Sequence, residues 1–257
     1  MARCVCRLLF MSNASSVSPS SPPAAAVRVS SIMDPRRAPV VQIDSALPAV
    51  APRLLLADSL RQAFVAHPHG GEPEIFRERS WTDRPPAKAA VLVALVQRQE
   101  MHVLLTQRSA GLTNHSGQIA FPGGRQDPED RDINDTALRE AWEEVGLARE
   151  RVEIIGRLPE YATGSGFGVT PIVGLVQPPF HLQANPGEVD EVFEVPLSFL
   201  MNPAHHRWQQ LDTPEFSRRW LSMPYDDPAS GQQRFIWGAT ASMLRNLYRF
   251  LAFPPAL

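Results

Sequence analysis

Two glycines and an acidic loop, GGRQDPED at residues 123–130, are followed by REAWEEVGL at residues 139–147. The first part is typical of a glycine turn that runs into a polar loop. Asn134 or Asp135 is placed to cap a helix after that loop, because a short polar side chain accepts a hydrogen bond from a free amide at a helix start. Gly146 is placed to end the helix, since glycine readily adopts the left-handed conformation. The stretch therefore predicts a turn, a loop and a helix.

The predicted helix separates apolar from acidic side chains. Its apolar stripe, at positions i, i+3, i+4 and i+7, consists of Leu138, Ala141, Trp142 and Val145. Glu140, Glu143 and Glu144 fall within an arc of roughly 100° on a different face. Carboxylates so close repel one another, and a divalent cation removes the conflict. Their oxygens suit Mg²⁺ or Mn²⁺, so the three glutamates are candidate metal ligands. By themselves they also fit an acidic face in water.

Arg139 lies next to the glutamates and has two readings. It is an i, i+4 partner of Glu143, which is a structural role. It also has the reach to hold a metal-binding carboxylate in the right rotamer. We expect Arg139 to do both.

With these residues in place, the stretch resembles the signature of the Nudix hydrolases. That signature is a glycine, five residues, a glutamate, seven residues, then Arg-Glu-U-x-Glu-Glu-x-Gly-U, where U is aliphatic. Counted from Gly124, this chain has Asp130 at the first acidic position and eight residues before Arg139, so it departs by one substitution and one insertion. The resemblance implies a mixed β-sheet between helices, an α/β (α+β) fold, with the glutamate helix and its loop as the catalytic floor.

The likeness extends upstream, to LLTQRSA at residues 104–110 and GQIAFPGG at residues 117–124. These blocks resemble the added motif of the coenzyme A diphosphatase branch, in which the loop acid and the insertion are also familiar. Thr113 stands where that branch usually has an arginine, which puts one phosphate contact in doubt. The resemblance covers about residues 53–252. It implies metal-dependent cleavage of coenzyme A to 3′,5′-ADP and 4′-phosphopantetheine.

Hydrolysis of a diphosphate needs negative charge to be neutralised and a water to be placed in line. The expected catalytic residues are Arg139, Glu143 and Glu191, and the expected metal ligands are Glu140, Glu143 and Glu144. Glu191 is taken from the acidic residues Glu188, Asp190 and Glu191, because the family draws an extra acid from outside its signature. A solvated loop is the alternative for each of the three.

Substrate contacts are expected in the upstream block. The expected residues are Arg108, His115, Gly123 and Gly124. The Arg108 guanidinium matches phosphate oxygens, with a surface ion pair as its alternative, and His115 is either a substrate contact or solvated. The two glycines would let the backbone approach phosphate groups closely. ADP-ribose or a dinucleotide is the alternative substrate, and a non-catalytic nucleotide sensor is the alternative from another functional class.

Composition limits the partners. The chain has 257 residues, 44% hydrophobic and 20% charged, with a net charge of −2 and scattered basic residues, which disfavours nucleic acid. No apolar run approaches the roughly 20 residues of a membrane span. Cys4 and Cys6 are too close to staple a core, so a reducing, cytoplasmic location is expected. The oligomeric state stays open, a homodimer included.

Residues 1–52 include a Ser/Pro/Ala-rich run, so we expect a disordered leader, either dispensable or an organellar transit peptide, before a domain at 53–257. Within that domain, apolar spacing predicts a first helix at 53–66 and a last helix at 239–250. A β-hairpin is expected from residues 89–96 and 102–106. Further strands are expected at 152–156, 169–176 and 191–195.

Overall fold

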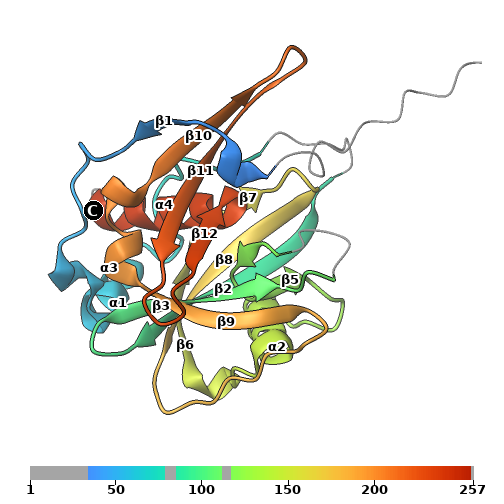
Figure 1. Cartoon of the computed structure of the whole chain (residues 1–257). Helices are drawn as coiled ribbons and strands as arrows, with labels where there is room; N and C mark the ends of the chain where they lie inside the picture. The colour runs from blue at the N-terminus through green and yellow to red at the C-terminus, as the bar shows by residue number, and fades with distance from the viewer. Residues whose placement is uncertain (1–33, 79–84, 112–116, 256–257) are drawn as a thin grey trace, which may run out of the picture. The chain divides into compact units, whose positions relative to one another are not determined.

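The structure is a computed structural model that describes residues 34–78, 85–111 and 117–255 (Figure 1). The chain divides into two compact units, Met1–Arg37 and Ala38–Leu257. The described part of the first unit holds one short 3₁₀ helix, η2 (Pro35–Arg37). The elements discussed below belong to the second unit.

The helices of the second unit are η3 (Pro52–Leu55), α1 (Ala57–Ala66), α2 (Ile133–Val145), η4 (Arg149–Arg151), α3 (Leu197–Leu200), η5 (Pro203–His205) and α4 (Gly238–Ala252). Its strands are β1 (Val40–Ile43), β2 (Ala87–Gln97), β3 (Met101–Arg108), β4 (Ile119–Ala120), β5 (Gly123–Arg125), β6 (Val152–Arg157), β7 (Tyr161–Ala162), β8 (Phe167–Val176), β9 (Val189–Pro196), β10 (Arg207–Asp212), β11 (Ser217–Asp226) and β12 (Gln233–Trp237). Among the described residues, no helix combines the length and the apolar character needed to cross a bilayer.

The larger sheet is mixed. Its strands run in the order β4-β3-β2-β8-β6, while β5 pairs with β2, β7 with β8 and β9 with β3. Strands β2 and β8 are parallel along ten residue pairs, from Ala87 opposite Phe167 to Val96 opposite Val176. The other pairs in this sheet are antiparallel. Figure 1 shows α2 beside the β2, β5 and β9 ribbons.

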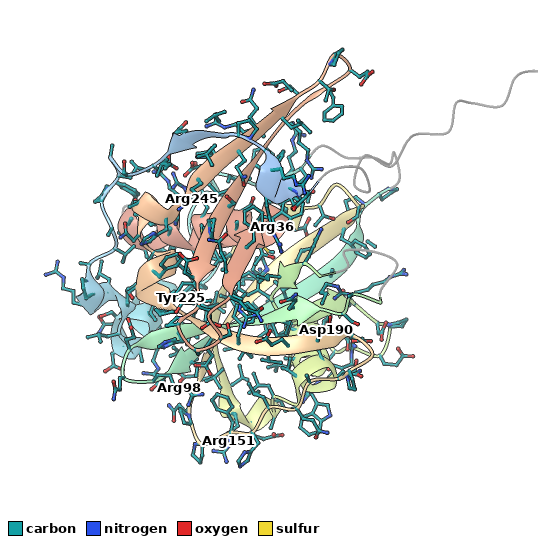
Figure 2. The ribbon with its side chains drawn as sticks, in the orientation of Figure 1. Arg36, Arg98, Arg151, Asp190, Tyr225 and Arg245 are labelled. Carbon is teal, nitrogen blue, oxygen red and sulfur yellow. The ribbon has the colours of Figure 1, made fainter. Side chains whose placement is uncertain are left out.

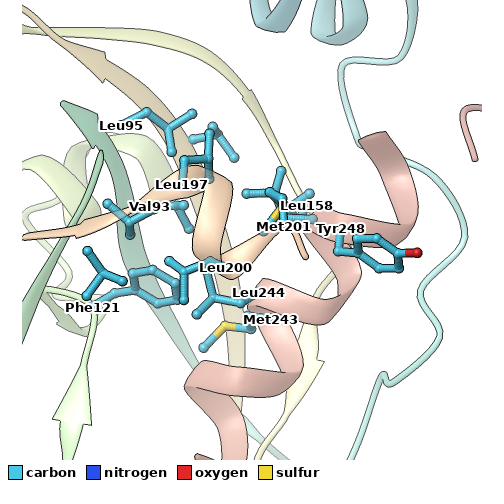
Figure 3. Packing of buried hydrophobic residues seen from close by; sticks show 14 of the residues in the cluster. Val93, Leu95, Phe121, Leu158, Leu197, Leu200, Met201, Met243, Leu244 and Tyr248 are labelled. Atoms are coloured by element: carbon cyan, nitrogen blue, oxygen red, sulfur yellow. The ribbon is translucent and has the colours of Figure 1, made fainter. Parts of the chain in front are cut away.

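Strand β2 is buried on both faces, which explains its continuous apolar run. Leu92 points to a core cluster that includes Ala137 and Ala141 of α2. Its neighbour Val93 points to the opposite cluster, where α1, α3 and α4 contribute leucines and phenylalanines. Figure 3 shows Val93 and Leu95 packed with residues of α3 and α4. The mixed sheet therefore lies between helices, and the predicted fold class is confirmed.

A second sheet, in the order β1-β10-β11-β12, was not predicted from the sequence. All three of its strand pairs are antiparallel. Its strands β11 and β12 contribute Leu221, Met223 and Ile236 to the cluster that also holds Leu244 of α4. Strand β11 includes Pro224 and buries four consecutive residues, Trp220 to Met223, so it lacks the alternation of apolar and polar residues that would have predicted a strand.

The predicted hairpin is confirmed as β2 and β3, and the strands predicted at 152–156, 169–176 and 191–195 correspond to β6, β8 and β9. The last predicted helix corresponds to α4. The first predicted helix is interrupted, because Leu56 is extended, with φ −75° and ψ 149°, between η3 and α1. An apolar spacing alone does not reveal such a break.

Two details of the glutamate helix differ from expectation. Asp132, not Asn134 or Asp135, caps α2, and its carboxylate accepts a hydrogen bond from the Asp135 amide at 2.8 Å. Trp142 was expected in the core but is 57% exposed, while Ala137 is fully buried. The buried face is therefore rotated toward Ala137, Ala141 and Val145, which brings Glu144 inward. Gly146 ends the helix at φ 68°, as predicted.

The expected leader at 1–52 differs from the structure over residues 38–52, which belong to the second unit. Val40 to Ile43 form β1 against β10. Val50 belongs to the main core cluster, and the buried Asp44 carboxylate lies 3.0 Å from the Arg245 guanidinium. These partners are distant in sequence, so composition could not reveal them. Residues 1–33 of the expected leader lie outside the described residues.

We predict that deleting residues 1–37 and deleting residues 1–47 have different effects on stability. The first deletion stops at the unit boundary and should change the thermal midpoint by no more than roughly 2 °C. The second removes Asp44 and leaves the buried Arg245 without one carboxylate. Loss of one partner from a buried ion pair typically costs about 3–5 kcal/mol, so the midpoint should fall by roughly 10 °C. Equal thermal midpoints for the two deletions, measured by calorimetry, would contradict a boundary between residues 37 and 38.

Candidate active site

Arg139, in the middle of α2, joins the acidic loop to the glutamate helix. Its Nε donates to Asp130 Oδ1 at 2.8 Å and its Nη2 donates to Asp130 Oδ2 at 3.0 Å. The Nη1 atom donates to Glu140 Oε1 and to Glu143 Oε2, both at 3.0 Å. A planar guanidinium offers donors in fixed directions, so these contacts hold three carboxylates in set orientations.

Asp130, the loop acid of the signature, is used to close the loop. Its side chain is 3% exposed, and besides Arg139 it accepts hydrogen bonds from the Asp127 amide and the Thr136 hydroxyl, each at 2.9 Å. The Arg139 hydrogen bonds lower the pKa of Asp130 to about 2, against the opposing effect of burial. Asp130 therefore stays ionised and fastens the loop to α2.

Glu144 is the most buried of the three glutamates, at 3% exposure. Its Oε2 accepts a hydrogen bond from the Gly123 amide at 3.1 Å, and Arg108 Nη1 lies 3.5 Å from its Oε1. Burial raises the pKa of Glu144 to about 7, although Gly123 and Arg108 both act to lower it. The carboxylate is thus desolvated and only partly compensated, which is an environment that favours an added positive charge.

The other two glutamates are less enclosed. The side chain of Glu140 is 15% exposed and that of Glu143 is 51% exposed. Burial raises the pKa of Glu140, and Arg139 offsets part of this effect. The three carboxylates therefore extend from the buried floor of the site to its solvent edge.

Gly123 and Gly124 lie on β5, where side chains have no room. A Cβ atom on Gly123 would come within 2.4 Å of the Ala90 carbonyl oxygen. A Cβ atom on Gly124 would come within 2.5 Å of a Glu140 carboxylate oxygen. The sequence led us to expect glycine here for the approach of phosphate groups. In the structure both glycines permit close packing against the chain itself, and this packing sets the position of Glu140.

The donors fit a divalent cation, although they are not yet gathered around it. Within the described ranges, no group of three or more His, Cys, Asp or Glu side chains surrounds a common point. Glu140 and Glu143 share Arg139, and Glu144 faces Gly123. Charge repulsion between Glu140 and Glu144 nevertheless adds to the raised pKa of Glu144. Hard, crowded carboxylate oxygens of this kind are the donors that Mg²⁺ and Mn²⁺ take.

The acidic residues at the start of β9, Glu188, Asp190 and Glu191, occupy three different environments. Asp190, labelled in Figure 2, accepts a hydrogen bond from the Ala110 amide at 3.0 Å. Both carboxylate oxygens of Glu191 accept from Arg234, at 2.6 and 2.5 Å, and these bonds lower the pKa of Glu191. Glu188 instead acts electrostatically on the site, because its charge adds to the raised pKa of both Glu140 and Glu144. Glu188 is linked to α2 through Asn185, whose carbonyl oxygen accepts from the Glu188 amide at 3.0 Å and whose amide donates to the Glu144 carbonyl oxygen at 2.9 Å, whereas Glu191 faces Arg234.

Of the residues expected to bind substrate, Arg108 lies at the end of β3 beside Glu144, with its side chain 29% exposed. His115 and Thr113 lie outside the described residues. Arg234 was missed by the sequence reasoning, since a single arginine in a short strand carries no local signal. Its importance appears only through its contact with Glu191.

Comparisons with known proteins found both a family and individual relatives. A model of the NUDIX domain matches residues 86–229. The chain is 41% identical over 159 residues to an uncharacterized Nudix hydrolase NudL of Photorhabdus laumondii, covering 62% of this chain and 82% of that protein. It is 44% identical over 163 residues to a NudL of Citrobacter koseri, covering 62% and 80%. A solved C. elegans Ap4A hydrolase complex is similar at 22% identity and a TM-score of 0.40, covering 65% of this chain and 98% of that one.

We predict that Arg139→Met destabilises the fold strongly. The change leaves Asp130 buried without its cation, and breaking a buried ion pair in this way costs on the order of 3–5 kcal/mol. Denaturant unfolding would measure the loss. Arg131→Met is the matched control, since Arg131 is 76% exposed in its pair with Asp135 and its replacement should change the free energy of unfolding far less. Similar losses in the two variants would show that the Arg139 pair is not a structural tie.

We also predict a pH dependence that belongs to Glu144. The pKa of this acid is about 7 in the folded protein and 4.5 ordinarily, so the unfolded chain releases its proton first. The folded state therefore loses stability as pH rises from about 4.5 to about 7, by roughly 3 kcal/mol, and is unaffected above that range. Thermal unfolding midpoints, measured between pH 5 and pH 8 in the presence of a metal chelator, would show this fall.

Glu144→Gln is the test variant, because an amide oxygen can still accept from Gly123. The variant should show a smaller fall in midpoint and should exceed the parent protein in stability at pH 8. If the difference between the two proteins is constant across this range, Glu144 does not have the raised pKa.

Proposed function

This chain belongs to the Nudix hydrolase family, and on that premise we propose that it hydrolyses the diphosphate bond of coenzyme A to give 3′,5′-ADP and 4′-phosphopantetheine. The observation that carries the proposal is the place of the upstream block, residues 104–124. It delivers Arg108 and Gly123 directly to Glu144. A substrate bound at the glutamate helix would therefore also meet this block.

In the proposed site, Glu140, Glu143 and Glu144 hold Mg²⁺ or Mn²⁺. The bound cation would neutralise charge on the non-bridging phosphate oxygens and lower the pKa of a water molecule. Arg139, which donates hydrogen bonds to Glu140 and Glu143, would hold these two carboxylates in the orientation that binds the cation. Asp130 keeps Arg139 in place throughout.

We assign the additional acid to Glu188 and no longer to Glu191. A general base must have a free oxygen within reach of the water, whereas both oxygens of Glu191 accept from Arg234. Glu188 is close enough to Glu140 and Glu144 to raise the pKa of each by charge repulsion. In this role Glu188 would take the proton of the attacking water while the glutamates of α2 remain with the cation.

Arg108 is proposed to select the substrate. Its contact with Glu144 is long, 3.5 Å, and would give way to a phosphate group. Coenzyme A carries a 3′-phosphate that ADP-ribose and dephospho-coenzyme A lack. A planar guanidinium binds such a group through two hydrogen bonds. The same catalytic helix would cleave any diphosphate, so the preference for coenzyme A rests on this contact.

The test is a comparison of kcat/KM for coenzyme A, dephospho-coenzyme A, ADP-ribose and diadenosine tetraphosphate with Mg²⁺ or Mn²⁺. Coenzyme A should be the best substrate, and Arg108→Ala should narrow its advantage over dephospho-coenzyme A because the phosphate contact is lost. Better turnover of ADP-ribose than of coenzyme A would remove the substrate assignment and leave the family unaffected.

Variants of the helix provide the control for the chemistry. Glu143→Gln and Glu144→Gln should each lower kcat by on the order of a hundredfold or more while the protein stays folded. A double variant with near-full activity would instead exclude these glutamates as metal ligands.

A further inference from the structure

We propose that Arg234 is a positioning residue of the active site, which acts through Glu191 to hold the start of β9 and thereby places Glu188 beside the glutamate helix. The inference rests on the proposed function, because it concerns the same site. Arg234 lies on β12 of the second sheet, beyond the residues 86–229 that match the family model. The second sheet would then be part of the catalytic framework.

Arg234 is buried and donates several hydrogen bonds. Its side chain is 2% exposed, and its guanidinium carbon lies 4.4 Å from the centre of the Phe193 ring. Besides the two bonds to Glu191, its acceptors are Asp227 at 3.0 Å, Ser230 at 3.1 Å and Gln107 at 3.5 Å. The group therefore joins β12 to both β3, through Gln107, and β9, through Glu191.

The contact with Glu191 falls where the pairing of β3 and β9 becomes irregular. Glu191 is opposite Gln107, but the next residue of β3, Arg108, is opposite Val189, so Asp190 is an extra residue in β9. A bulge of this kind bends a strand and changes the direction of the side chains near it. Arg234 thus holds Glu191, which belongs to the last regular pair before the bend. Along the chain, Glu191 is two residues from Val189, the partner of Arg108, and three residues from Glu188.

The bend is also tied to the loop that follows β3. The Ser109 amide donates to the Glu188 carbonyl oxygen at 2.8 Å, and the Ala110 amide donates to the Asp190 carboxylate at 3.0 Å. Glu188, Asp190 and the residues after Arg108 therefore move as one segment. At its start the segment is also held by Asn185, whose carbonyl oxygen accepts from the Glu188 amide at 3.0 Å and whose amide donates to the Glu144 carbonyl oxygen of α2 at 2.9 Å. Arg234 supplies the contact on the other side of the bend, at Glu191.

The molecule contains a matched control in Arg245 of α4. Its side chain is 3% exposed, it pairs with Asp44 at 3.0 Å and Glu74 at 2.8 Å, and it lies 5.1 Å from the centre of the Tyr248 ring. None of these partners belongs to α2, β3 or β9. Figure 2 shows Arg245 well away from Asp190. The two arginines are equivalent in burial and pairing but differ in their relation to the site.

The experiment compares Arg234→Met, Arg245→Met and Glu191→Gln with the parent protein, each assayed with Mg²⁺ and coenzyme A below its thermal midpoint. Both arginine variants should lose a similar amount of stability. Only Arg234→Met should lower kcat, by roughly tenfold to a hundredfold, because small displacements of a catalytic group have effects of this size. Arg234→Lys, which keeps the charge, should recover part of the loss and serves if the methionine variant does not fold.

Glu191→Gln separates positioning from catalysis. A positioning role predicts the same loss as for Arg234→Met, and no further loss in the double variant, because the two residues act through one contact. A loss of a thousandfold or more in Glu191→Gln alone would make Glu191 a catalytic residue and overturn the proposal. Equal kcat values for Arg234→Met and Arg245→Met would also overturn it.

Amide hydrogen exchange gives a readout that does not depend on the substrate. Arg234→Met should speed exchange at Ser109 and Ala110 tenfold or more, because their acceptors lie in the released segment, and Arg245→Met should not. Unchanged exchange in Arg234→Met would refute the positioning role even if coenzyme A is not cleaved. Conversely, if the protein cleaves none of the four test compounds, the proposed function fails. Faster exchange in Arg234→Met would then still support the positioning role.

Discussion

The bonds from the Arg139 guanidinium to the Asp130 carboxylate connect two parts of the chain that would otherwise be independent. Asp130 closes the acidic loop, and the remaining donor of Arg139 reaches Glu140 and Glu143 on the helix. Because Arg139 sits inside α2, the loop can take only the path that meets it there. That path leads back to Gly123 and Gly124, whose lack of side chains lets β5 lie against β2 and Glu140. One ion pair thereby fastens the acidic loop to the glutamates of α2.

The site is electrostatically unbalanced in a way that suits its chemistry. Asp130 is fully compensated by Arg139, so its pKa is about 2, whereas burial raises that of Glu144 to about 7. Two acids, one in the loop before α2 and one near the end of that helix, thus have opposite environments. The first has a structural task, and the second is held where a proton or an added cation would offset its desolvation. Uncompensated burial weakens the fold, and the large two-sided core supplies the stability that tolerates it.

The second sheet lies outside the signature residues 124–147 and has two roles. Its strands pack on α4 and complete the main core cluster, which is a structural contribution. Through Arg234 the same sheet also grips β9 at the residue where regular pairing ends. A strand that is held firmly on one side of a bulge presents the other side in a defined direction. Core packing and site geometry are therefore coupled at this contact.

The sequence by itself determined the elements whose signals are local. Periodicity predicted the β2–β3 hairpin and α4, and the acidic loop, the apolar spacing and Gly146 predicted α2 and its end, because these patterns lie within a few residues of one another. Asp44 was placed in a disordered leader, yet it is buried against Arg245, 201 positions later. Glu191 was expected to act on a water molecule, yet Arg234, 43 positions later, holds both of its oxygens. Only the tertiary structure decided these cases, because the partner that fixes a charged side chain can lie anywhere along the chain.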